Sequence, residues 1–503
     1  MNEFSKIIKF IEYILRENWW QRVRNFLFLI GEGAFDLCIN LIIMVMVERT
    51  LGTAGLGVFA YLLSILIFAG FISDFGISRY LEREISFNSE GSAKIQAIEK
   101  ALYAVLITSI FCAVLFFITA LSDTDYTKVD EKAIAYIIIG ITIPIRNFNR
   151  IRIAILQGSG KFGDAAKLKT WKRIFLFGAT YFLLICHLPA SILVAGYLAS
   201  ELGLLFKARK LMKLPALKNI WRKQNRIHSI LTQSSRFLLT DETLDVVLHL
   251  DFLLLGIYVS SGDLGIYAQA SILARMFLII PISIKPVFRN QYCSLAAKNQ
   301  IRTTALTVQR STALLFFFHS VLALYILLFY PSITQTLYHV KGISLAPFYI
   351  FAQILPGLLF FSAVTSQEPI YEAEDKVNLL QNTIIIISLL NLILNFFFIP
   401  FAGYYGAAFA TSASMFCYFI LFGRHLSSAF KTQKYEYIIA GSAVYLTYIL
   451  FQKLALSFAV SFFLVPAFLF LLFFAINFFN LKTGRIDSES VKISPETIYT
   501  KEV

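Results

Sequence analysis

Residues 54–76 read AGLGVFAYLLSILIFAGFISDFG, an apolar run with no charged residue before Asp74. As a helix, a run of this length would rise about 35 Å, enough to cross the hydrocarbon core of a bilayer. Inside lipid the backbone amides must find their partners within the segment, and a helix provides them. The sequence therefore predicts a transmembrane helix over 54–76.

Similar runs recur along the whole chain, which is 57% hydrophobic and 15% charged and has a mean hydropathy of +0.69. We count fourteen runs, each long enough to span a membrane. Their predicted limits are 26–47, 54–76, 101–121, 133–156, 171–187, 189–206, 237–259, 264–288, 311–329, 343–365, 377–399, 402–423, 435–452 and 455–480. This pattern predicts an all-α polytopic membrane protein.

The 45 lysines and arginines are sorted between alternate gaps in this pattern. With the N-terminus inside, 38 of them fall in cytoplasmic segments and five in outer loops, because short basic loops stay in the cytoplasm. The sorting predicts that both termini are cytoplasmic. The two remaining residues, Arg146 and Arg275, lie near the middle of a span.

The first twelve spans divide into two similar halves. Gly55-Leu56-Gly57-Val58-Phe59-Ala60 opens the second span, and Asp263-Leu264-Gly265-Ile266-Tyr267-Ala268 opens the eighth, 208 residues later. Pro144 and Pro356 extend the correspondence. Six plus six spans in parallel repeat are typical of transporters whose halves rock around a site at the midplane.

The repeat predicts the domain organisation. An N-terminal segment at 1–25 has apolar residues at helical spacing and is predicted to lie in the inner membrane interface, a solvated tail being the alternative. The remaining parts are an N-lobe at 26–206 with six spans, a basic cytoplasmic linker at 207–236, a C-lobe at 237–426 with six spans, two further spans at 427–480 and a cytoplasmic tail at 481–503.

The composition excludes several classes of protein. The formal net charge of +14 does not require a nucleic acid partner, because most of the excess is predicted to face anionic lipids of the cytoplasmic leaflet. The cysteines show no paired or metal-like spacing, so we expect no disulfide, metal site or cofactor. Gly158-Ser159-Gly160-Lys161-Phe162 looks like part of a phosphate-binding loop but has Phe where Ser or Thr would hold magnesium, and we interpret it as a tight inner turn.

Two polar stripes are the first candidates for function. Each places three residues four positions apart, and therefore on one face of a helix, where ionisable groups are expensive unless they meet a partner or water. The stripes are Glu32, Asp36 and Asn40 in the first span and Asp241, Asp245 and His249 in the seventh. The ion-coupling candidates are therefore Asp36, Glu32, Asp245, Asp241 and His249. The alternative is that the acids pair with basic groups and lock helices together.

Three other acids stand apart from these stripes. Asp251 lies in the outer half of the seventh span and is interpreted as a contact between helices. Glu201 and Glu368 stand alone and are interpreted as structural groups rather than ligands.

Arg146 and Arg275 are the second candidates for function. An arginine at the centre of a membrane helix costs roughly 2.5–3.5 kcal/mol by insertion scales, so something must offset it. A guanidinium fork matches phosphate oxygens bidentately, which suits a phosphate or pyrophosphate that crosses the membrane interior. Internal pairing with Asp36 or Asp245 is the alternative. Arg150 continues from Arg146 toward the inside, either as part of an access path for the anion or as ordinary inner-end charge.

Several motifs resemble those of Wzx-type polysaccharide flippases. These flippases belong to the multidrug/oligosaccharidyl-lipid/polysaccharide exporter superfamily, together with multidrug and toxic compound extrusion transporters and lipid II flippases. In the first half the resemblance is carried by Leu51-Gly52, Gly55-Leu56-Gly57-Val58-Phe59, Asp74-Phe75-Gly76-Ile77 and Arg83-Glu84; in the second half it is carried by Asn391, Asn395, Pro400, Gly403, Gly406, Ala407, Ala408 and Thr411. It covers about residues 25–425.

The resemblance implies two six-helix lobes around a cationic central cavity, with two additional C-terminal helices here. It also implies an undecaprenyl-diphosphate-linked oligosaccharide, such as an O-antigen unit of lipopolysaccharide, as substrate in a bacterial inner (cytoplasmic) membrane. Arg275 lies in a span where such relatives can carry a cavity arginine, whereas Arg146 matches no family motif. The implied partners are the lipid-linked glycan, anionic lipids and glycan polymerase machinery.

We therefore expect a secondary transporter that flips a lipid-linked oligosaccharide by alternating access, coupled to an ion. The alternative is a cation or drug antiporter of the same fold, which needs acids but no cavity arginines. A membrane enzyme such as a glycan polymerase would be expected to present a sizeable outer loop with catalytic groups, and every predicted outer loop is short.

Overall fold

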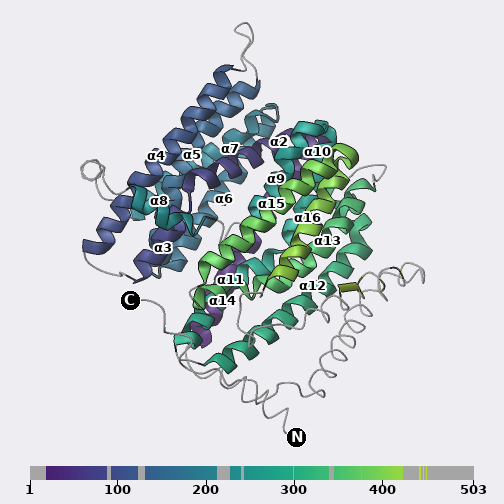
Figure 1. The fold of residues 1–503 in the computed structure, drawn as a ribbon. Helices are drawn as coiled ribbons and strands as arrows, with labels where there is room; N and C mark the ends of the chain where they lie inside the picture. The colour runs from purple at the N-terminus through teal and green to yellow at the C-terminus, as the bar shows by residue number, and fades with distance from the viewer. Residues whose placement is uncertain are drawn as a thin grey trace.

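The computed structural model describes residues 19–87, 92–122, 131–211, 227–238, 243–297, 300–338, 345–374 and 376–422, with five further positions between 441 and 449. Within these ranges the chain forms helices and no strands (Figure 1). The helices are α2 (Trp19–Asp74), α3 (Ile77–Phe87), α4 (Ser92–Ser122), α5 (Glu131–Gly158), α6 (Phe162–Ile185), the 3-10 turn η1 (Ile192–Val194), α7 (Ala195–Leu211), α8 (Ile227–Ser235), α9 (Thr243–Tyr258), α10 (Ser261–Phe277), α11 (Ile279–Ala297), α12 (Ile301–Tyr338), α13 (Ala346–Thr365), α14 (Glu368–Ala373), α15 (Val377–Ala402) and α16 (Tyr404–Leu421).

These helices coincide with the first twelve predicted spans. Six of them are long and apolar enough to cross a membrane on length and composition alone. Of the others, α5 and α6 carry several charged residues, and α9 and α10 are only 16 and 17 residues long. The protein is an all-α polytopic membrane protein, as the sequence predicts. The predicted spans 435–452 and 455–480, residues 1–18 and the tail lie outside the described residues, apart from those few positions.

Two spans run together in α2 and are separated at Gly52. Its φ of 72° lies in the left-handed region, which a residue without a Cβ adopts at little cost. The break falls between the predicted spans 26–47 and 54–76. The predicted turn at Gly158–Phe162 is also observed, between α5 and α6.

The eighth predicted span is divided. The structure replaces a single run over 264–288 by α10 and α11, which meet at Leu278. Ser260 begins α10 as a cap: its Oγ accepts a hydrogen bond from the Asp263 N–H (3.2 Å) and donates one to Asp263 Oδ2 (2.7 Å). The cap fixes the first turn of α10, from which Arg275 projects near its other end.

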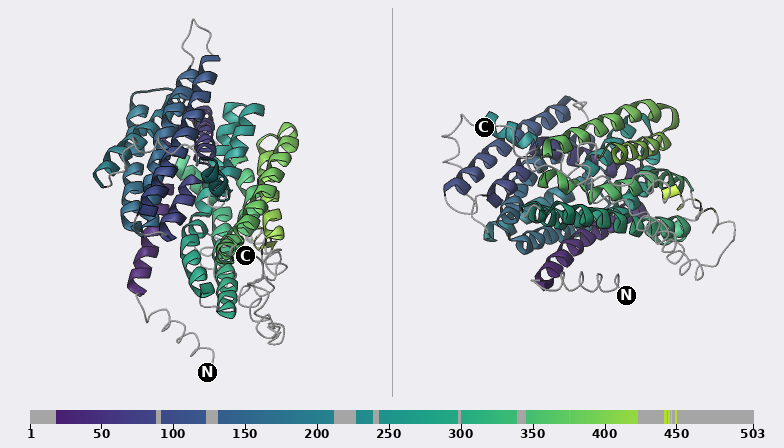
Figure 2. Two further views of the ribbon diagram at one scale, coloured as in Figure 1. Left: turned by 60° about the vertical axis from the view of Figure 1, so that its left-hand side comes forward. Right: turned by 60° about the horizontal axis from the view of Figure 1, so that its bottom comes forward.

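The helices form two bundles, which we call the N bundle (α2–α7) and the C bundle (α9–α16). They lie side by side in Figure 1 and in both views of Figure 2. The short helix α8, inside the predicted linker 207–236, packs on α3 and α4 of the N bundle. Tyr80 of α3 donates a hydrogen bond to Gln233 Oε1 at 2.6 Å. Part of the linker is thus attached to the N bundle; residues 212–226 lie outside the described ranges.

The bundles meet along a seam, formed mainly by α2 with α9, α10 and α11. We call its end near Gly57 the outer end and its end near Asp74 the inner end, following the predicted orientation. At the outer end the two repeated motifs touch, because a Cβ on Gly57 would overlap the Ser261 carbonyl oxygen and one on Gly265 would overlap that of Thr53. Gly57 and Gly265 are equivalent in the repeat, so the bundles meet there through like surfaces.

The inner end is bridged by charge. Arg79 of α3 lies 3.6 Å from Glu372 Oε2 of α14, and the same oxygen lies 2.8 Å from Arg289 Nε of α11. Glu372 therefore joins an arginine of each bundle. The seam is closed at both ends in this conformation.

Candidate functional site

Arg275 and His249 meet at the middle of the seam. Arg275 NH1 lies 2.9 Å from His249 Nε2, and His249 Nδ1 lies 2.7 Å from Ser64 Oγ of α2. The imidazole ring is 2% exposed, so it is held between the bundles rather than in a loop. Two residues predicted for different roles, one for substrate binding and one for ion coupling, thus form one contact.

Arg146 approaches the same part of α2 from the other side. Its NH1 donates a hydrogen bond to the Leu66 carbonyl oxygen at 3.1 Å. The guanidinium lies against Gly70, where an added Cβ would be 2.8 Å from NH1 and 3.2 Å from Cζ. The absence of a side chain at Gly70 gives Arg146 its place beside α2.

The two arginines converge from different bundles. Arg146 donates to the Leu66 carbonyl oxygen, and Arg275 contacts the His249 ring, which lies 2.7 Å from Ser64 Oγ. Ser64 and Leu66 are two residues apart on α2, so the two guanidinium groups approach the same stretch of this helix.

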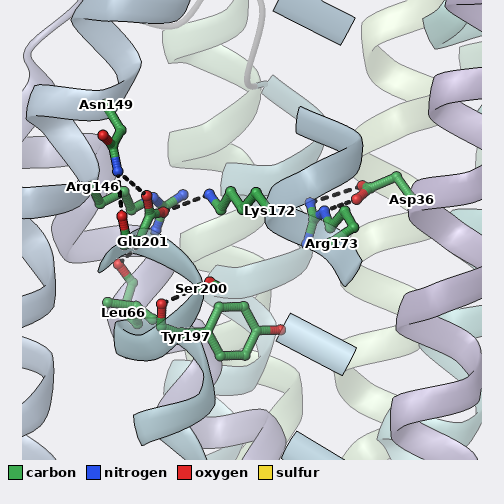
Figure 3. Close-up of polar contacts among 9 residues, drawn as sticks. All are labelled: Asp36, Leu66, Arg146, Asn149, Lys172, Arg173, Tyr197, Ser200 and Glu201. Carbon is green, nitrogen blue, oxygen red and sulfur yellow. Dashed lines mark hydrogen bonds and ion pairs between the residues drawn. The ribbon is translucent and has the colours of Figure 1, made fainter. Parts of the chain in front are cut away.

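A second group of charges lies deeper in the N bundle. Lys172 Nζ is 2.5 Å from Glu201 Oε1, and Asn149 Nδ2 donates to Glu201 Oε2 at 2.9 Å and to the Glu201 carbonyl oxygen at 2.8 Å (Figure 3). Glu201 is 1% exposed. It is a satisfied structural group, as its isolated position in the sequence indicates, but the sequence does not point to Lys172 as its partner.

Asp36 is paired with Arg173. Arg173 NH2 donates to Asp36 Oδ2 at 2.9 Å, and a second contact joins Nε to Oδ1. Lys172 and Arg173 are neighbours on α6 and point in opposite directions, one toward Glu201 and the other toward Asp36 (Figure 3). The structure thus holds Asp36 in an ion pair between helices and pairs it with neither Arg146 nor Arg275.

Sequence reasoning missed Lys172 and Arg173 because they stand at the first positions of the predicted span 171–187, where basic residues are ordinary inner-end charge. The helix begins at Phe162, so these residues lie ten and eleven positions inside it, roughly 15 Å from its start. A run of apolar residues marks the lipid-facing length of a helix, and it ends early when one face is polar. The two residues are adjacent in the sequence and therefore point to different faces, so they form no stripe of helical spacing that would have revealed them.

The other predicted residues are placed as follows. Arg150 is half-buried and acts electrostatically, with Arg146, on Lys172. Its neighbour Arg152 donates to the Leu205 carbonyl oxygen at 3.0 Å and lies over the Phe148 ring. Glu32 and Asp245 lie in α2 and α9 with side chains outside the described set, and Asp241 lies outside the described residues.

Asp251 forms a site that the sequence analysis interpreted only as a contact between helices. Tyr267 donates to its Oδ2 at 2.7 Å, Asn395 Nδ2 donates to its Oδ1 at 2.8 Å, and the Thr411 hydroxyl makes a further short hydrogen bond to Oδ2. Asp251 is 0% exposed, and no basic side chain pairs with it among the described residues. Asp251 does join helices, as interpreted, but it is also a buried carboxylate that only neutral groups contact among the described residues.

Oxygen atoms gather around this carboxylate. Asn395 Nδ2 also donates to Asn391 Oδ1 at 3.0 Å, and the buried Asn395 Oδ1 has no hydrogen-bond partner within the described residues. A buried carboxylate beside amide and hydroxyl oxygens is the donor set that hard cations prefer. The asparagines lie in the span that carried the family resemblance, but their partner α9 could not be known from the sequence.

The second isolated acid, Glu368, is also satisfied. Its Oε2 lies 2.5 Å from Lys285 Nζ of α11, and Tyr418 of α16 donates to Oε1 at 3.0 Å. Glu368 is 2% exposed. This pair lies toward the inner end of the C bundle and ties three of its helices together, which is the structural role predicted for Glu368.

The arrangement is related to known proteins by sequence and by fold. The profile of the polysaccharide biosynthesis protein family matches residues 22–288. No curated protein matches the chain by sequence. Among solved structures, the lipid II flippase MurJ in an inward closed conformation has a TM-score of 0.66 at 16% identity, over 90% of this chain and 99% of that one.

Two further structures share the fold at lower similarity. An inward-facing multidrug resistance MATE family transporter of the MOP superfamily has a TM-score of 0.56 at 14% identity, over 82% of this chain and 96% of that one. A MOP superfamily transporter from Pyrococcus furiosus, described as having a binding pocket of reverse polarity, has a TM-score of 0.55 at 13% identity, over 84% of this chain and 96% of that one.

Proposed function

Because this chain belongs to the polysaccharide biosynthesis protein family, we propose that it flips an undecaprenyl-diphosphate-linked oligosaccharide across a bacterial cytoplasmic membrane. The proposed orientation places both termini in the cytoplasm, and it follows from the sorting of the basic residues. The fold shared with a lipid II flippase and with MATE transporters supports transport rather than catalysis.

The observation that carries the proposal is the convergence of Arg146 and Arg275. Each projects from a different bundle, and both reach the same stretch of α2: Arg146 donates to the Leu66 carbonyl, and Arg275 contacts the His249 ring beside Ser64. Guanidinium stays protonated and binds phosphate oxygens through parallel N–H donors. We propose that the two arginines hold the diphosphate while the sugars lie between the bundles and the lipid tail stays in the bilayer. Arg150 would extend this cationic path inward.

Alternating access is supported by how the bundles meet. At the outer end they touch through glycines, which hold nothing together covalently or by charge. At the inner end they are joined by Glu372, whose carboxylate lies near one arginine of each bundle. The ion pair between Arg79 and Glu372 separates at low cost, because an ion pair that remains partly exposed to solvent is worth little. Separation at one end with closure at the other would expose the arginines to each side in turn.

Ion coupling is proposed for Asp251 in preference to Asp36. Asp36 already has a guanidinium partner, so a cation would have to displace Arg173. Asp251 is surrounded by neutral oxygen and amide groups, and a proton or sodium ion there would neutralise a buried carboxylate. Moving one charge through the membrane potential supplies roughly 2.3 kcal/mol per 100 mV, enough to bias such a cycle.

The second candidate is a cation or drug antiporter, which the shared fold with MATE transporters favours. Such a protein needs the acidic site but not the arginines. Replacing Arg146 and Arg275 by alanine should abolish flipping of a lipid diphosphate and leave cation export intact. The two functions therefore give opposite results with the same variant.

The direct test is deletion of the gene in its host. We expect undecaprenyl-linked glycan to accumulate on the inner leaflet, and we expect the intact gene, but not the R146A/R275A variant, to reverse it. A deletion strain with normal lipid-linked glycan and increased sensitivity to cationic dyes would reject the proposed function.

A further inference from the structure

A chain of hydrogen bonds crosses the seam at Ser64. The Ser64 hydroxyl donates to the Ala60 carbonyl oxygen of its own helix at 2.8 Å. Its Oγ lies 2.7 Å from His249 Nδ1 of the C bundle, and His249 Nε2 lies 2.9 Å from Arg275 NH1. Ser64 and His249 are 1% and 2% exposed, so water does not replace any of these partners cheaply.

The direction of each bond in this chain follows from the donors available. A guanidinium only donates, so His249 Nε2 must carry a lone pair and accept from Arg275. The single proton of the neutral ring is then on Nδ1 and is donated to Ser64 Oγ, whose own hydrogen is committed to Ala60. Arg275 NH2 also lies 3.3 Å from His249 Nδ1, which is the longest of the ring's contacts. The tautomer with its proton on Nδ1 satisfies the three shorter contacts, and in it the approach of NH2 to Nδ1 is not a hydrogen bond.

We propose that His249 is a positioning residue for Arg275, and that Ser64 holds it in the tautomer that accepts from the guanidinium. This inference rests on the proposed function, in which Arg275 binds the diphosphate. Because both terminal nitrogens of Arg275 lie against the His249 ring, the ring fixes the direction of the guanidinium within the seam. Ser64 touches no substrate, yet it sets the direction of the group that does.

The chain also joins the position of the bundles to the binding of the anion. Ser64 belongs to the N bundle, whereas His249 and Arg275 belong to the C bundle. When the bundles move apart at this depth, His249 loses the acceptor for Nδ1–H, and the ring that positions Arg275 is no longer held in one tautomer. The diphosphate is thus held firmly when the seam is closed and weakly when it opens.

This role differs from the ion coupling predicted for His249 from its stripe. A proton-carrying His249 would present N–H groups on both sides and would face Arg275 with like charge, with Arg146 acting on the same ring. The observed contacts need a neutral acceptor. A glutamine offers an acceptor oxygen and a donor amide but cannot carry a proton, so it separates the two roles.

The test measures binding of farnesyl diphosphate, as a soluble lipid diphosphate probe, to the full-length protein in detergent. Losing a hydrogen bond to a charged group is worth about 1.5–3 kcal/mol, or roughly ten- to a hundredfold in affinity. We expect His249→Lys to lose affinity by that factor, Ser64→Ala by about three- to tenfold, and His249→Gln to stay within about threefold of the parent. His249→Gln should also keep its response to the ion gradient in cells.

His319→Gln is the matched control, because His319 is another fully buried histidine, on α12, that bonds the Leu315 carbonyl at 2.7 Å. It should bind the probe like the parent. Equal losses in His249→Gln and His249→Lys, with both proteins folded by size-exclusion chromatography, would overturn the inference. So would unchanged binding in His249→Lys. If Arg275→Ala also binds the probe normally, the proposed function itself fails, and the two failures are thereby distinguished.

Discussion

The N bundle and the C bundle stabilise their buried acids in different ways. In the N bundle, Asp36 and Glu201 are each paired with a basic residue of α6. In the C bundle, Glu368 is paired with a lysine toward the inner end, but Asp251 is held only by neutral donors among the described residues. The two halves of the repeat thus share a helix arrangement but differ in how their buried acids are compensated.

The largest expected effect comes from breaking a pair in the N bundle. Replacing Glu201 by alanine leaves the Lys172 ammonium without its carboxylate in a nearly closed site. We expect the free energy of unfolding to fall by about 3–5 kcal/mol, because an uncompensated buried charge is costly. Unfolding in mixed micelles by sodium dodecyl sulfate measures the change.

Asp164→Ala in α6, the helix that carries Lys172, is the control, since Asp164 pairs with the exposed Lys167 at 3.7 Å. Its loss should change the free energy of unfolding by less than about 1 kcal/mol. Similar losses in both variants would show that Glu201 and Lys172 are solvated like a surface pair.

The second prediction removes the acid of the C bundle. Asp251→Asn should abolish the dependence of transport on the ion gradient, whereas Asp36→Asn should retain it. One charge moving through 100 mV corresponds to about 2.3 kcal/mol, or roughly fiftyfold in the accumulation ratio, which sets the size of the loss. Transport in membrane vesicles with and without an imposed gradient gives the answer. The opposite result would assign coupling to the N bundle.

The third prediction concerns the contact between the bundles at the outer end. Gly57→Ala should hold the bundles apart there, because its Cβ would overlap the backbone of α10. Overpacking of this kind costs about 1–3 kcal/mol, so the closed outer end becomes a minor state. The reporter is an Ala268→Cys variant, whose cysteine is alkylated by a membrane-impermeant reagent. Adding Gly57→Ala to this variant should make the alkylation faster.

Gly178→Ala is the matched control for Gly57→Ala. Gly178 lies in α6, and a Cβ there would meet nothing within 4 Å. Labelling at position 268 should not change in this variant. Labelling that responds to neither substitution would mean that the outer end stays closed even when its glycine is filled.

The smallest effect is expected at the inner end. Arg79→Gln removes the ion pair to Glu372 and leaves the contact of Glu372 with Arg289 in place. Because the pair is near the surface, we expect a shift of about 1 kcal/mol, or roughly fivefold, toward an open inner end. Spin labels on the native Cys293 of α11 and on Ser86→Cys of α3 would report the separation. Arg289→Gln should not produce this separation, because Arg289 and Glu372 belong to the same bundle.

The sequence predicts which residues of a helix take part in contacts better than it predicts their partners on other helices. The glycine motifs and the two central arginines can be singled out in the sequence because period, spacing and cost of burial are local properties. That Gly57 touches Gly265, and that Asp251 meets Asn395 and Thr411, depends on which helix faces which. Helical spacing defines a face but not its neighbour, so these partners became known only from the structure.

The errors of prediction have a similar origin. Lys172 and Arg173 are not among the candidates because they fall at the very start of the predicted span 171–187, whereas the helix begins earlier, at Phe162. Hydropathy averages over all faces of a helix, and a helix with one polar face therefore appears too short. The stripe in the seventh span predicts ion coupling for His249, and its contacts with Ser64 and Arg275 became known only from the structure.

The glycine contact at the outer end also acts as a fulcrum. Ser64 lies seven residues beyond Gly57 on α2, about 10 Å away, and Asp74 lies about 25 Å away at 1.5 Å per residue. A rotation of about 20° around the contact would displace Asp74 by roughly 9 Å and Ser64 by roughly 3–4 Å. The second displacement exceeds the reach of the hydrogen bond between Ser64 and His249. The lever arms alone therefore make loss of that bond accompany every opening of this size.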